Sequence, residues 1–89
     1  MLIPLGYTIG KMQKLPNGRN QLTGGVDIYI YNGEKHRQGG PAEINNFTGY
    51  KAWFKHGLRH RFRLPAVIDP INKTQEYWEE GKFIRRESI

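Results

Sequence analysis

The stretch VDIYIYNGEK, residues 26–35, carries the strongest structural signal in the chain. Val26, Ile28 and Ile30 alternate with an aspartate and two tyrosines, which is the two-residue period of a strand with one buried face. The strand runs directly into Asn32-Gly33, and this dipeptide favours a tight hairpin because both residues tolerate a positive φ. Residues 26–35 therefore predict a β-hairpin.

The hairpin pattern returns at intervals of 24 residues, marked by Gly33, Gly57 and Gly81. The other positions that match at this interval are Tyr29, Trp53 and Tyr77; Ile30, Phe54 and Trp78; His36 and His60; Arg37, Arg61 and Arg85; Pro41-Ala42 and Pro65-Ala66; and Ile44 and Ile68. Stacked arrays of equivalent units commonly have atypical ends. We predict a single all-β domain, an antiparallel meander of about three β-hairpin repeats. It comprises a cap over 1–25 and units over 26–49, 50–73 and 74–89, the last incomplete.

The repeat register also predicts where side chains and turns lie. The residues that recur just before each hairpin turn should line opposite faces of the sheet, Tyr29, Trp53 and Tyr77 on one and Ile30, Phe54 and Trp78 on the other. Residues 45–49 and 69–73 are expected to be return turns. Pro41 and Pro65 fit bulges or strand starts, because proline cannot donate a ladder hydrogen bond. Residues 72–83 have a helix-tolerant composition, but the register makes them a strand.

The shared pattern, an aromatic residue followed by Gly, His-Arg and Pro-Ala, resembles the W-Y-x-N-G-x-x-H-R-x-x-G-P-A repeats of phage and large DNA virus proteins. Those repeats in turn resemble divergent MORN-type repeats. The resemblance covers about residues 26–86 and is fullest over YIYNGEKHRQGGPAEI, residues 29–44. It implies a meander of β-hairpins, a viral or phage origin and a binding role rather than an enzymatic one. The second unit departs from the motif at His56 and Leu64.

Length and composition narrow the class of protein. Eighty-nine residues make one small domain, and a single thin sheet would leave one apolar face wet, so homo-oligomerisation stays an open alternative. The absence of cysteine excludes disulfides and thiolate chemistry, and it favours the cytoplasm of the host cell. The N-terminal sequence predicts no signal peptide, and no apolar run is long enough for a membrane span.

Catalytic and metal-binding chemistry find little support in the sequence. Ser88 is the single serine and the threonines lack motif context, so no nucleophile–base pair can be assigned and no enzyme is expected. His56 and His60 have the four-residue spacing of a helical ligand pair, but the register puts one in a turn and the other in a strand. We expect neither a metal site nor a cofactor. The recurrence of His36 and His60 favours a structural role, with one ring nitrogen bonding a carbonyl of a neighbouring turn.

A basic aromatic strip is the predicted binding site. The net charge is +6, and residues 44–68 hold five basic residues and no acid. If residues 59–63 form a strand, Arg59, Arg61 and Arg63 share one face. The predicted site consists of Trp53, Lys55, Arg59, Arg61, Phe62 and Arg63.

Two partners suit a surface of this kind. A host protein or ribonucleoprotein complex, such as a defence complex that the protein would inhibit, suits its aromatic and arginine content. Nucleic acid or a nucleotide is the alternative, because cations neutralise phosphates and aromatic rings stack on bases.

Overall fold

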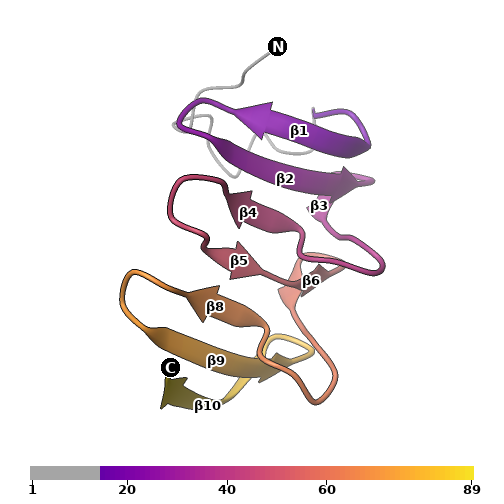
Figure 1. Cartoon of the computed structure of the whole chain (residues 1–89). Helices are drawn as coiled ribbons and strands as arrows, with labels where there is room; N and C mark the ends of the chain where they lie inside the picture. Colours follow the sequence, from indigo (N-terminus) through magenta and orange to yellow (C-terminus); the bar gives the residue numbers. More distant parts are fainter. Residues whose placement is uncertain (1–14) are drawn as a thin grey trace.

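The computed structural model describes residues 15–89, and the predictions for the N-terminal cap that fall on residues 1–14 lie outside this range. The described chain is all-β and contains no helix, which confirms the all-β part of the predicted fold class. The strands run antiparallel, and the main sheet is a meander with the order β1-β2-β4-β5-β8-β9-β10, in which β3 also pairs with β2 (Figure 1). Strands β6 and β7 form a separate two-stranded sheet. Their bounds are β1 Gly18–Leu22, β2 Val26–Tyr31, β3 Glu34–Lys35, β4 Glu43–Asn45, β5 Lys51–Ala52, β6 Phe54–Lys55, β7 Leu58–Arg59, β8 Val67–Asp69, β9 Thr74–Glu79 and β10 Lys82–Ser88.

Three tight hairpin turns join β2 to β3, β6 to β7 and β9 to β10. In each turn both central residues have a positive φ, as a type I′ turn requires. The φ values are 50° and 81° at Asn32-Gly33, 48° and 81° at His56-Gly57, and 49° and 79° at Glu80-Gly81. The prediction of equivalent hairpins around the three glycines is therefore confirmed, as is the prediction that residues 74–79 form a strand.

Two return turns lie at the ends of the strands away from the three hairpin turns, and a side-chain oxygen closes each of them (Figure 1). Asn45 Oδ1 accepts hydrogen bonds from the backbone N–H groups of Phe47 (2.9 Å) and Thr48 (3.2 Å). Asp69 lies 24 residues later, and its Oδ1 accepts the backbone N–H groups of residues 71 and 72 at 3.1 Å each. Asn and Asp at the start of a turn satisfy its free backbone N–H groups in this way. The turns predicted over 45–49 and 69–73 are confirmed.

The apolar core lies on one face of β2. Val26, Ile28 and Ile30 are buried, with only 2% of Ile28 and Ile30 exposed, and Leu15 and Leu22 pack against them. Farther along the sheet the buried apolar residues are Val67 and three alanines, Ala42, Ala52 and Ala66, which are fully buried. The large buried side chains therefore concentrate at the β1–β2 end of the sheet.

The strand predicted over residues 59–63 is not present, and this prediction is wrong. β7 ends at Arg59, and the backbone N–H of Arg61 donates to the carbonyl of Trp78 (3.1 Å) instead of continuing the β6–β7 ladder. Trp78 lies in the third of the 24-residue segments, which we number first (26–49), second (50–73) and third (74–89). Pro65 carries no N–H and so cannot support a ladder farther on. Residues 60–66 consequently form an irregular connection to β8. The corresponding residues 36–42 connect β3 to β4 in the same way.

We expect the folded state to lose stability in acid. The pKa of Glu76 is lowered chiefly by the Trp78 indole N–H, which donates at 2.9 Å, and that of Asp69 by hydrogen bonds from Asn72. Hydrogen bonds from Gln75 and Tyr77 likewise lower the pKa of Glu87. A carboxylate with a lowered folded-state pKa stabilises the fold above its unfolded-state pKa, and this stabilisation is lost as the pH falls through the folded-state value.

The melting temperature, followed by circular dichroism, should therefore fall as the pH drops below the ordinary glutamate value of 4.5. Glu76→Gln should lower the melting temperature at neutral pH and bring it closer to that of the wild type in acid. A melting temperature of the wild type that does not change between about pH 6 and pH 2 would contradict this role of the carboxylates.

Candidate binding surface

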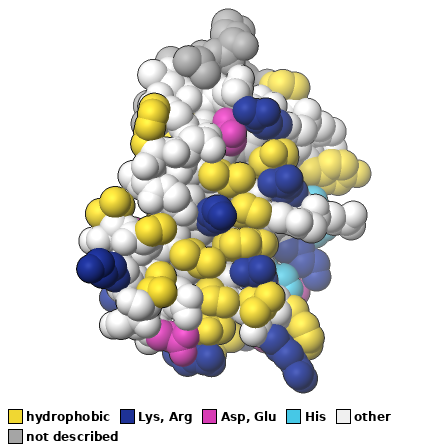
Figure 2. Space-filling model, in the orientation of Figure 1, with side chains coloured by type: hydrophobic (Ala, Val, Ile, Leu, Met, Phe, Trp, Pro, Cys, Tyr) yellow, Lys and Arg dark blue, Asp and Glu magenta, His cyan; other side chains and the backbone are white. Residues whose placement is uncertain are grey.

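A ladder of arginines stacked on aromatic rings occupies one face of the sheet, which we call the ladder face. The guanidinium carbons of Arg37, Arg61 and Arg85 lie 3.9, 3.9 and 3.8 Å from the ring centroids of Tyr29, Trp53 and Tyr77, respectively. Strand pairing through Asp27, Ile44, Lys51, Ile68 and Gln75 places the three rings on the same face. In Figure 2, basic and hydrophobic side chains alternate along the direction in which the strands stack.

The first two arginines also hold the backbone of the irregular connections. A terminal nitrogen of Arg37 donates to the Pro41 carbonyl at 3.1 Å, and that of Arg61 donates to the Pro65 carbonyl at 3.2 Å. Burial lowers the pKa of the Arg61 guanidinium. Stacking on a ring and donation to a carbonyl fix the position of each guanidinium and tie the connection to the sheet. Arg37 and Arg61 are therefore architectural, and neither is a free surface cation.

Arg59 is also held inside the structure, on the other side of the sheet. Its guanidinium carbon lies 5.1 Å from the Trp78 ring and 6.0 Å from the Phe54 ring. Lys35 occupies the matching position in the first segment, where its amine lies 4.9 Å from the Phe54 ring and 2.7 Å from a carboxylate oxygen of Glu43. Cations and aromatic rings thus alternate across neighbouring segments, and the partial burial of Arg59 removes it from the predicted surface strip.

The two recurring histidines join adjacent segments. Nδ1 of His36 accepts the backbone N–H of His56 at 3.0 Å, and Nδ1 of His60 accepts the backbone N–H of Glu80 at 2.9 Å. The N–H of the next residue in each turn, Gly57 or Gly81, donates across the same boundary to the carbonyl of residue 35 or 59, both at 2.8 Å. Each histidine contacts the neighbouring turn as expected, but its partner is an amide N–H, so the predicted bond to a carbonyl is wrong.

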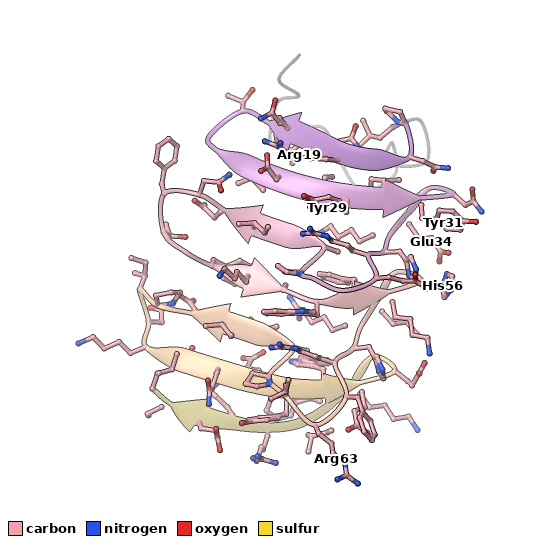
Figure 3. All side chains as sticks on the ribbon, turned by 45° about the vertical axis from the view of Figure 1, so that its right-hand side comes forward. Arg19, Tyr29, Tyr31, Glu34, His56 and Arg63 are labelled. Atoms are coloured by element: carbon pink, nitrogen blue, oxygen red, sulfur yellow. The ribbon has the colours of Figure 1, made fainter. Side chains whose placement is uncertain are left out.

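A protruding loop, Phe62–Arg63–Leu64, follows the architectural Arg61. Phe62 is 67% exposed and Leu64 is 50% exposed, and the Arg63 guanidinium carbon lies 5.1 Å from the Phe62 ring. Figure 3 shows the Arg63 side chain pointing away from the sheet. This loop presents two apolar side chains around a cation, a combination suited to contact with another macromolecule.

The six predicted site residues do not form one strip. Trp53 and Arg61 form the stacked base below the protruding loop, and Phe62 and Arg63 form the loop itself. Lys55 is exposed and pairs with Glu80 at 3.2 Å. Arg59 is turned toward the other face.

Sequence reasoning missed Leu64 and the participation of Arg37 and Arg85 in the ladder. The signal for both arginines was present, since they match Arg61 at the 24-residue interval.

A groove of about 580 Å³ lies beside the hairpin of the first segment. Tyr31, His36, Arg37 and Lys55 line it together with His56, and the His36 and His56 rings stack with centroids 4.3 Å apart. Figure 3 shows the labelled Tyr31, Glu34 and His56 gathered at the end of β2. Among these lining residues, only Lys55 belongs to the predicted site.

Comparison with known proteins yields no match to a protein-family model, to a curated protein or to a solved structure. Residues 15–89 contain no helix of the length and apolar character needed to cross a membrane. Over the same part of the chain, no three side chains of metal-ligating type are grouped so that they could hold an ion.

Proposed function

We propose that this protein is a small, non-enzymatic accessory protein of viral or phage type, built from about three MORN-like hairpin repeats. It binds and inhibits a host protein or defence complex in the host cytoplasm. The interface that we assign is the protruding loop, Phe62–Arg63–Leu64, on the base formed by Trp53 and Arg61. The repeating contacts 24 residues apart support the repeat architecture, and the exposure of Phe62 and Leu64 supports the position of the interface.

The backbone conformation of Arg63 carries this proposal. Arg63 has a φ of 59°, in the left-handed region that is unfavourable for most residues with a side chain. The matching residue of the first segment is Gly39, which has a φ of 80° and adopts this conformation without steric cost. A strained residue with an exposed charged side chain, at a position where glycine fits, is typical of a functional surface.

The chemistry of the loop indicates the kind of surface that would bind it. Phe62 and Leu64 require apolar contact, and Arg63 between them requires a carboxylate or another acceptor. Because Arg61 is fixed by Trp53 and Pro65, the base of the loop is already ordered before binding, which reduces the entropic cost of association. An acidic protein surface with an apolar pocket meets these requirements.

Site-directed crosslinking can test this interface, because the protein has no cysteine and a single introduced cysteine would be the only thiol. We expect Phe62→Cys, labelled with a maleimide photocrosslinker, to give a discrete protein adduct in a bacterial host lysate. Gln38→Cys is the matched control, since Gln38 is the exposed equivalent of Phe62 in the first segment, and it should not give that adduct.

Nuclease treatment separates the two partner classes. A protein adduct that survives nuclease supports the proposal, whereas an adduct that disappears with nuclease would indicate the nucleic-acid alternative. The same adducts from positions 38 and 62 would show that the protruding loop is not the interface. Full labelling of both variants and unchanged circular dichroism spectra control for reactivity and folding.

A further inference from the structure

The groove beside the first hairpin differs in charge from the matching region one segment later. Lys55 and His56 of the second segment border this groove, and the residues at their equivalent positions 24 residues later are Glu79 and Glu80. The backbone around these two pairs of positions is held in the same way, because His36 and His60 accept hydrogen bonds from the equivalent turns. Of the described residues that line the groove, none is acidic. The groove, unlike its counterpart, is therefore suited to an anion.

Stacking surfaces accompany this positive charge. Tyr31 is 48% exposed at the edge of the groove, and its ring centroid lies 5.8 Å from that of His36. The His56 ring stacks on the other imidazole and has 56% of its side chain exposed. Aromatic and imidazole rings of this kind bind nucleobases by stacking with little dependence on sequence. The groove thus joins flat stacking surfaces to the cations Arg37 and Lys55.

We propose that this groove binds a nucleoside phosphate. Its base stacks on Tyr31 and on the exposed part of the His56 ring, its phosphate accepts hydrogen bonds from Lys55, and the fixed positive charge of Arg37 in the lining attracts that phosphate. The volume of about 580 Å³ suits a mononucleotide and greatly exceeds what inorganic phosphate alone would fill. This site lies between the first hairpin and the His56-Gly57 turn of the second segment, and it shares no residue with the protruding loop at residues 62–64.

Two nearby carboxylates limit the affinity of the groove for an anion. Glu80 pairs with Lys55 at 3.2 Å, and both side chains are at least half exposed, so Lys55 can exchange this partner for a phosphate. A carboxylate oxygen of Glu34 lies 3.9 Å from His56 Nδ1. These carboxylates reduce the net positive charge around the groove. We therefore expect moderate affinity, with a dissociation constant for a mononucleotide of about 0.1–1 mM.

Titration of the full chain with AMP, adenosine and inorganic phosphate, followed by amide chemical shifts in two-dimensional NMR, tests the proposal. We expect AMP to shift the backbone amides of Tyr31, His36 and His56 in a saturable way. Adenosine and phosphate should each bind at least tenfold more weakly, because each makes only one of the two kinds of contact. Absence of saturable shifts up to about 10 mM AMP would overturn the proposal, and so would equal affinity for phosphate and AMP.

A charge-swap pair provides the control. His56→Glu copies the residue that the next segment carries at the same turn position, where Glu80 has a φ of 49°, close to the 48° of His56. The substitution therefore suits the backbone, and we expect it to weaken AMP binding at least tenfold. Glu80→His makes the reciprocal change and should leave a saturable AMP site in the groove, since Lys55 loses only a competing carboxylate. Unchanged affinity in His56→Glu, with an unchanged melting temperature, would exclude the groove.

Discussion

Replacing Ile28 with alanine is expected to lower the free energy of unfolding by about 3 kcal/mol. Ile28 is 2% exposed and lies at the centre of the core row on β2, between Val26 and Ile30. Shortening this side chain removes buried apolar contacts and leaves a cavity that the paired strands β1 and β4 cannot close without losing their register. In a domain of this size such a loss is a large part of the total stability.

Chemical denaturation followed by tryptophan fluorescence measures this effect, and Ile44→Ala is the matched control. Ile44 lies on the ladder face, pairs with Asp27 and is only half-buried. The same substitution there should cost about 1 kcal/mol, because less apolar surface returns to water. Equal losses in the two variants would mean that the row on β2 is not the dominant core, contrary to the burial of its side chains.

The second large effect is a difference in stability between substitutions of Arg61 and of Arg63. Arg61→Ala is expected to lower the free energy of unfolding by about 2 kcal/mol, since it removes both the stack on Trp53 and the charged donor to the Pro65 carbonyl. Arg63→Gly should cause no loss of stability, because glycine adopts a positive φ without strain and the ring beside Arg63, Phe62, is itself exposed.

Partner binding, unlike stability, is expected to depend more on Arg63 than on Arg61. Under the proposed function, adding Arg63→Gly to the labelled Phe62→Cys variant should abolish its adduct, while the melting temperature stays at or above that of Phe62→Cys alone. Adding Arg61→Ala should reduce the yield of the adduct only partly, because the loop loses the fixed base that Arg61 provides but keeps Arg63. Equal melting temperatures for the two combinations would contradict the architectural role of Arg61. Retention of the full adduct with Arg63→Gly would contradict the role of Arg63 in binding.

A triple substitution of Arg59, Arg61 and Arg63 would mix these effects and could not identify an interface. Arg59 and Arg61 pack against aromatic rings, so their loss would act on the fold as well as on any bound partner.

The parts of the fold that were predictable depend on local chemistry. The alternation in VDIYIY and the Asn32-Gly33 turn are properties of a few consecutive residues, and they specify the hairpin. Alignment on Gly33, Gly57 and Gly81 then transferred this assignment to turns with weaker signals, at His56-Gly57 and Glu80-Gly81. The same register correctly placed a strand at residues 74–79, against a helix-tolerant composition.

The predicted placement of Arg59, Arg61 and Arg63 on one face was wrong because it assumed that a strand continues through residues 59–63. Strand length there is decided by a long-range contact, the bond from the Arg61 N–H to the Trp78 carbonyl, and no local pattern reports it. The distinction between an arginine that stacks and one that is free also depends on which ring lies beneath it. Arg61 lies on the ring of Trp53, whereas Arg63 lies beside the exposed ring of Phe62.

By itself, the sequence determined the all-β class, the positions of the tight turns and the 24-residue interval, because strand alternation and positive φ are imposed by short-range sterics. Only the tertiary structure decided which cations are available for binding. It packed Arg37, Arg59 and Arg61 against aromatic rings, left Arg63 exposed and gathered residues of two segments around the groove. Burial and partner choice are properties of the assembled sheet, since they depend on contacts between residues far apart in the chain.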